Sequence, residues 1–142
     1  MAKSKYIPTF RWSSFNHVAF TLVRTQAQLD MVCPINDKEV FMGDNPKAHA
    51  MCAFRPQPSG QVHCIIQMPL STAGAKMTRI QALALLTHEV THLWQCVRDE
   101  MSGSEKPSYE FEAYSMQQLM HDVLDMYAAS ENSLTGAKYL LE

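Results

Sequence analysis

The residues best suited to chemistry are the two histidines of the segment His88-Glu89-Val90-Thr91-His92. In an α-helix, residues four positions apart lie one above the other on the same face, so both imidazoles can approach a single point. Imidazole nitrogens are common zinc ligands. A glutamate directly after the first histidine can reach a water bound to the metal and take its proton. The segment therefore predicts a zinc (Zn2+) site with His88 and His92 as ligands and Glu89 as general base.

An apolar helix is expected around this segment. The residues from Ile80 to Thr87, and then Leu93 and Trp94, are apolar nearly all round, which is typical of a buried helix. Ionisable side chains are rarely buried without a partner or a metal. The alternative is that the two histidines are a structural pair that binds no metal.

A catalytic zinc has three protein ligands and an open position, so a third donor must follow in the chain. Glu110 and Glu112 are the candidates, in a helix expected over residues 108–129. Glu112 begins an apolar stripe that would face the core, whereas Glu110 begins a polar stripe. The apolar stripe holds Met116, Leu119, Met120, Val123 and Tyr127, and the polar one holds Tyr114, Gln117 and His121. A carboxylate at the head of an apolar stripe is costly unless it is paired. We therefore predict Glu112 as the third ligand, with Glu110 as the alternative; both would also suit a solvated first turn.

With these residues the chain resembles the zincin metallopeptidases, and among them the gluzincins, whose third ligand is a glutamate on the following helix. Nineteen residues separate His92 from Glu112, which is similar to the thermolysin-type spacing. The run Glu110-Phe111-Glu112-Ala113 is also similar to the Glu-x-Glu-Ala pattern of the small ImmA/IrrE-like peptidases of phages and mobile elements. The resemblance covers roughly residues 78–124. It implies a zinc-dependent metallopeptidase, an enzyme that hydrolyses peptide bonds of a protein or peptide substrate, with a phage origin.

The chain departs from the thermolysin pattern at two positions. Phe111 stands where that family has asparagine, and Met116 stands where it has the aspartate that orients a ligand histidine. The family's device for fixing the histidine tautomer therefore does not carry over. The chain also lacks room for the helical second domain of thermolysin, so a minimal zincin, of SprT-like or ImmA-like size, is the closer comparison.

Length and composition predict one globular domain over residues 1–142. Apolar residues make up 46% and charged residues 18% of the chain, and the formal charge is −2. This charge gives no support for a nucleic-acid binder, which usually has a basic excess. There is no run of about 18 apolar residues and no apolar signal-peptide core, so we expect a cytoplasmic protein with no membrane span.

Taken in order, the chain predicts an α+β fold of the minimal zincin type. An amphipathic helix is expected over residues 9–32, a short strand at Glu39–Met42, and a hairpin from runs 49–54 and 61–68. The sheet should be small and mostly antiparallel. In the zincins an edge strand beside the metal pairs with an extended substrate, and the run 61–68 is the candidate for that strand. Thr78 and Gln81 fit a capping box, so the apolar helix should begin there and run to about Arg98. The last helix should break at residues 130–133.

Two further sets of residues need an interpretation. A hairpin centred near Pro58 would place Cys52 opposite Cys64, and for a cytosolic protein we favour two reduced, buried thiols over a disulfide. The donor for the oxyanion of peptide hydrolysis stays open. Its candidates are Tyr109, Tyr114, His63 and His121.

Two other functions compete with the proposed peptidase. One is a binding or structural protein in which zinc holds a zincin scaffold together, but such a site has no need of Glu89. The other is a DNA-associated role like that of SprT-type proteases, which is the weakest because no basic segment is present.

Overall fold

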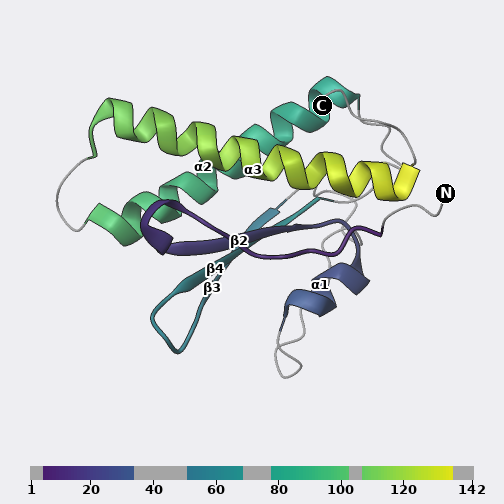
Figure 1. Cartoon of the computed structure of the whole chain (residues 1–142), viewed down its shortest axis with the longest axis horizontal. Helices are drawn as coiled ribbons and strands as arrows, with labels where there is room; N and C mark the ends of the chain where they lie inside the picture. Colours follow the sequence, from purple (N-terminus) through teal and green to yellow (C-terminus); the bar gives the residue numbers. More distant parts are fainter. Residues whose placement is uncertain (1–4, 34–50, 69–77, 103–106, 136–142) are drawn as a thin grey trace.

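The computed structural model of the chain describes residues 5–33, 51–68, 78–102 and 107–135. It shows an α+β fold in which two long helices lie across one face of a small mixed sheet and a short helix lies below the other face (Figure 1). The elements follow in the order β1 (Arg11–Trp12), η1 (Ser14–Asn16), β2 (Val18–Val23), α1 (Gln26–Val32), β3 (Met51–Pro56), β4 (Val62–Gln67), α2 (Arg79–Ser102) and α3 (Tyr109–Thr135). No helix in these ranges is long and apolar enough to cross a membrane.

The sheet has the strand order β1-β2-β4-β3. Strand β1 pairs antiparallel with β2, and β3 pairs antiparallel with β4, as the predicted hairpin requires. Strands β2 and β4 are parallel, with Val18 opposite Val62 and Val23 opposite Gln67. The sheet is therefore mixed rather than mostly antiparallel. A parallel pair needs a long connection, and here α1 and the chain after it supply it.

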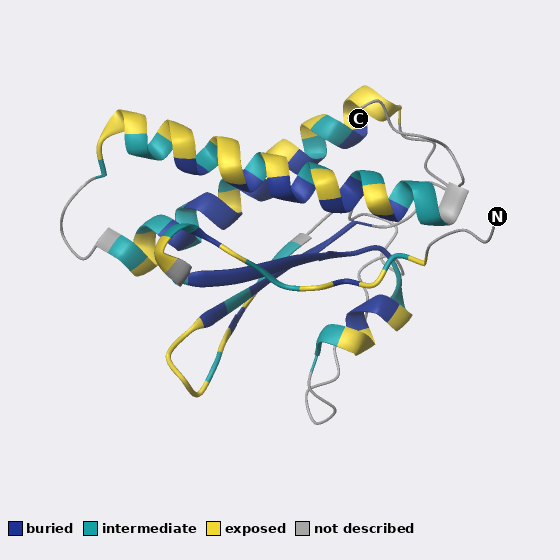
Figure 2. Cartoon of the chain, in the orientation of Figure 1, coloured by how far each residue is buried: buried dark blue, intermediate teal, exposed yellow. Residues whose placement is uncertain are grey.

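Each face of the sheet has its own apolar cluster (Figure 2). On one face, Phe20, Cys64 and Ile66 pack with residues of α2 and α3 such as Leu93 and Val123. On the other face the smaller cluster is Val23, Leu29 and Ile65, with Phe10, Val32 and Cys33 against it. Neighbouring residues of a strand point to opposite faces, so Cys64 faces α2 whereas Ile65 faces α1.

The single helix expected over residues 9–32 is wrong. The chain there forms β1, η1, β2 and only then the short helix α1. Every residue of β2, from Val18 to Val23, is buried. A strand that is covered on both faces is a continuous apolar run, which periodicity alone does not distinguish from a buried helix. The expected strand at 39–42 lies outside the described residues.

The predicted start of α2 agrees with the structure, but its predicted end does not. Gln81 N donates to Thr78 Oγ1 over 3.1 Å, and Thr78 N donates to Gln81 Oε1 over 2.9 Å, so the capping box is confirmed. The helix continues past the expected end near Arg98 to Ser102. Helix α3 runs without the expected break at 130–133 to Thr135.

The buried guanidinium of Arg24 explains why α3 continues through residues 130–133. Its Nη1 donates to Ser130 Oγ over 2.8 Å, its Nη2 to Glu131 Oε1 over 2.6 Å, and its Nε to the Met68 carbonyl over 2.7 Å. The Tyr127 ring lies 4.8 Å below the guanidinium carbon. These polar residues serve a tertiary contact, so they extend the helix rather than end it.

We expect Arg24→Ala to lower the free energy of unfolding by about 3–5 kcal/mol, because it leaves Glu131 without its buried cation. Arg11→Ala is the matched control. Arg11 also joins α3, through Asp122 and Asp125, but its side chain is 37% exposed, so about 1 kcal/mol or less is expected. Urea unfolding curves of the two variants test this, and equal losses would contradict it.

Candidate functional site

Helix α2 places the three residues of the motif at its boundary with the sheet. Glu89 is 4% exposed, and its neighbour Val90 is completely buried. His88 and His92 are both exposed, on the rim of the same helix. The prediction that this helix is buried all round is therefore wrong, since Ile80 is also exposed. Because Glu89 is buried, its carboxyl group needs a partner. The exposed histidines are solvated and do not need one.

The two imidazoles meet as the i, i+4 spacing predicts. His88 Nε2 and His92 Nε2 are 3.2 Å apart, and the rings are nearly perpendicular, with centroids 4.8 Å apart. Two nitrogens that each lie about 2.05 Å from a tetrahedral zinc are about 3.3 Å from one another. The separation of the two nitrogens therefore matches that of two zinc ligands. In the absence of a metal, one proton between the nitrogens satisfies the same contact.

A third residue of α2, Gln95, orients one of these rings. His92 Nδ1 lies 3.0 Å from Gln95 Oε1. A carbonyl oxygen only accepts, so Nδ1 carries the proton and Nε2 keeps its lone pair for His88 or a metal. A hydrogen bond to the second ring nitrogen is also how the tautomer of a metal-binding histidine is usually fixed. We did not predict this role, although the i, i+3 spacing from His92 was a usable signal.

The carboxyl group of Glu89 has properties suited to a base. Burial raises its pKa above the usual glutamate range, and the charges of His88 and His92 partly oppose this increase. A raised pKa brings a carboxylate closer to the pH at which it exchanges protons with substrate groups. The group also lies near the sheet, because its charge contributes to a raised pKa of the Cys64 thiol.

Among the residues that the structure describes, none is placed as a third ligand beside the histidines. Glu112 is half-buried at the start of α3 and Glu110 is exposed, so the predicted difference between the two stripes is confirmed. Within the described ranges, however, no group of three or more His, Cys, Asp or Glu side chains is placed to hold a metal ion. The separation of His88 Nε2 and His92 Nε2 is compatible with zinc, whereas Glu89 as base and Glu112 as third ligand stay predictions.

The edge strand next to α2 is β3, not the run 61–68. Strand β4 lies between β2 and β3, so both of its sides are paired, whereas β3 is terminal among the described strands. On β3, Phe54 is 42% exposed and stands opposite Cys64 in the register. Since Cys64 faces α2, an apolar ring at the sheet edge lies on the same face as Glu89.

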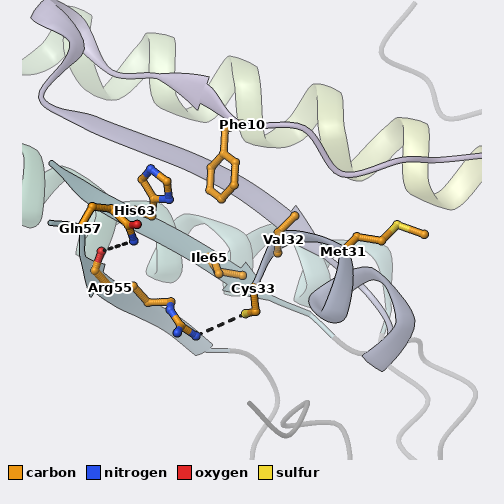
Figure 3. A pocket seen from close by; sticks show the side chains of 8 residues that line it. All are labelled: Phe10, Met31, Val32, Cys33, Arg55, Gln57, His63 and Ile65. Carbon is orange, nitrogen blue, oxygen red and sulfur yellow. Dashed lines mark hydrogen bonds between the residues drawn. The ribbon is translucent and has the colours of Figure 1, made fainter. Parts of the chain in front are cut away.

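The predicted oxyanion donors do not converge on the histidines. His63 points to the other face of the sheet, where its ring lies 4.6 Å from Phe10 in a pocket of about 280 Å³ (Figure 3). Tyr109 is 90% exposed and Tyr114 is 67% exposed. His121 is also exposed, 3.3 Å from Asp122. The geometry excludes His63 as the oxyanion donor and does not favour any one of the other three candidates.

Comparisons with protein-family models, curated proteins and solved structures found no match to this chain.

We expect Gln95→Ala to weaken zinc binding by about 10-fold, because the His92 ring loses the acceptor that fixes its tautomer. Competition with a chromogenic chelator measures the affinity. In the metal-free protein, the ¹⁵N shifts of the His92 ring should show loss of the Nδ1–H form. Gln117→Ala, at an exposed position of α3, is the control. If the zinc affinity and the His92 tautomer were unchanged in Gln95→Ala, Gln95 would not orient the His92 ring.

We expect Glu89→Gln, measured in chelator, to be more stable than the wild type near neutral pH by on the order of 1 kcal/mol. The raised pKa of Glu89 means that the folded state binds this proton more tightly than the unfolded chain does. Stability from that proton is present at low pH and is lost as pH rises above the usual glutamate range.

Urea unfolding at a series of pH values from about 4 to 8 should therefore show a gap between variant and wild type that grows with pH. Glu110→Gln, which changes an exposed carboxylate, is the matched control. A gap for Glu89→Gln that is the same at every pH would contradict a buried, charged Glu89.

Proposed function

We propose that this protein is a zinc-dependent metallopeptidase, with His88 and His92 as metal ligands and Glu89 as general base. The observation that supports it most is the 3.2 Å contact between the two Nε2 atoms beside a buried carboxylate. Two structural histidines have no need of a buried acid between them. A general base for hydrolysis is what that acid supplies.

A bound zinc supplies Lewis-acid chemistry, lowering the pKa of water and polarising a peptide carbonyl. The chain's own residues do the rest. Gln95 holds the proton of His92 on Nδ1, which leaves His92 Nε2 with a lone pair beside His88 Nε2. Glu89 takes a proton from the attacking water at its carboxylate and later gives it to the leaving amine. Its low exposure keeps bulk water from competing for that proton.

The substrate would lie along β3. A terminal strand offers backbone N–H and C=O groups to an extended peptide, which adds as a further strand. Exposed Phe54 on the face toward α2 favours an apolar side chain in that peptide. The predicted substrate is therefore an extended segment of a protein. A zincin-like arrangement with Glu112 from α3 completing the metal site belongs to the same proposal.

We expect protein purified without added metal to hold about one zinc per chain, measured by elemental mass spectrometry. Glu89→Gln should keep this zinc but lose cleavage by at least 100-fold, because the base is removed and the ligands are not. Cleavage is measured on a proteome-derived peptide library by mass spectrometry of new termini. Glu112→Ala should lose zinc, and Glu110→Ala should keep it.

The outcomes separate the competing functions. Absence of zinc even after reconstitution would refute the proposal and leave the histidines as a structural pair. Retained cleavage in Glu89→Gln would refute the mechanism. Stoichiometric zinc with no cleavage of the library or of intact proteins by the wild type would replace the peptidase with a zinc-stabilised binding protein. Full zinc content in both glutamate-to-alanine variants would exclude Glu110 and Glu112 as the third ligand.

A further inference from the structure

Two thiols lie in contact on the face of the sheet that α2 covers. Cys52 Sγ of β3 is 2.7 Å from Cys64 Sγ of β4, and no disulfide joins these two residues in the structure. The expected register, with Cys52 directly opposite Cys64, is off by two residues. Cys52 stands opposite Ile66 and Cys64 opposite Phe54, so the cysteines are diagonal neighbours on one face. The backbone hydrogen bonds of the hairpin hold them there.

We propose that Cys52 and Cys64 form a redox-active pair, which a peroxide converts to a disulfide that joins β3 to β4. The sulfur atoms already lie close to the 2.05 Å length of an S–S bond, and the paired strands fix both Cβ positions. Bond formation therefore joins two sulfur atoms that are already in contact on neighbouring strands.

The order of the steps follows from exposure. Cys64 is completely buried, whereas Cys52 is half-buried and is the sulfur that a peroxide reaches. The Cys52 thiol loses its proton, the thiolate attacks one oxygen of hydrogen peroxide and the O–O bond breaks, giving a sulfenic acid; the departing hydroxide takes the proton from Cys52 and becomes water. The Cys64 sulfur then attacks the Cys52 sulfur, and the departing hydroxide takes the Cys64 proton as a second water. Two electrons pass from the thiols to the peroxide.

The other two cysteines of the chain do not form this pair. Cys33 lies on the opposite face of the sheet, 3.3 Å from Arg55 Nη1 (Figure 3). Cys96, on α2, is near enough to Cys52 for their charges to interact, and burial is the main cause that raises the pKa of its thiol to about 11. Cys96 is therefore a poor nucleophile at neutral pH. No contact between its sulfur and another thiol competes with the 2.7 Å contact in the described residues.

The test uses the reduced full chain, treated with a small molar excess of hydrogen peroxide and then alkylated with N-ethylmaleimide in denaturant. Of the four cysteines, two should now escape alkylation, and the unalkylated protein should lose the mass of two hydrogen atoms. Chymotrypsin cleaves after Phe54 and so separates the cysteines; the digest should contain one peptide pair joined through Cys52 and Cys64. Dithiothreitol should restore four adducts.

Two variants serve as controls. The double variant Cys33→Ser/Cys96→Ser should form the same bond at the same rate. In Cys64→Val the second step is absent, so a dimedone adduct should accumulate on Cys52. Disulfides mapped to Cys33 or Cys96, four free thiols after treatment, or irreversible oxidation of Cys52 in the wild type would each overturn the proposal. None of these readouts depends on peptidase activity or on zinc.

Discussion

The packing of α2 on the sheet is the constraint on which the rest of the structure depends. Leu86, Val90 and Leu93 of this helix are completely buried against β2 and β4. Because the helix has 3.6 residues per turn, burying these three residues also fixes the direction in which each neighbouring side chain points. Glu89 must enter the boundary between helix and sheet, and the histidines before and after it must lie on the rim. A rotation of α2 by one residue would expose the acid and bury an imidazole, so the apolar pattern and the candidate site are specified together.

The exposure of the histidines changes the basis of the metal interpretation. The sequence argument depended on burial, which applies to Glu89 but not to His88 or His92. The remaining support for a metal site is geometric. The two Nε2 atoms are separated as two zinc ligands are, and Gln95 fixes the tautomer of the His92 ring that leaves Nε2 unprotonated. An exposed rim is also where a metal must lie if a peptide is to reach it. Helix α3, anchored to the sheet through Arg24, is the element that would have to supply the third donor.

Features that depend on neighbouring residues were predictable from the sequence, whereas those that depend on distant partners were not. The Thr78 capping box, the hairpin expected from the runs 49–54 and 61–68, and the two stripes of α3 each follow from spacing within a few residues. The described residues have all three, although the register of the hairpin differs by two residues from the expected one. The strand character of Val18–Val23 depends on burial by both faces of a sheet that the sequence does not display. The extension of α3 past residue 130 depends on Arg24, more than a hundred positions away.

Cys64 connects the two chemistries of this face, since it contacts Cys52 and also lies within reach of the charge on Glu89. Burial is the main cause that raises the pKa of the Cys64 thiol, and Cys52, Cys96 and a charged Glu89 add to it. The raised pKa disfavours ionisation of Cys64, so this residue reacts second, as the sulfur that attacks oxidised Cys52. Cys52 reacts first with an oxidant because it is the more exposed of the two cysteines.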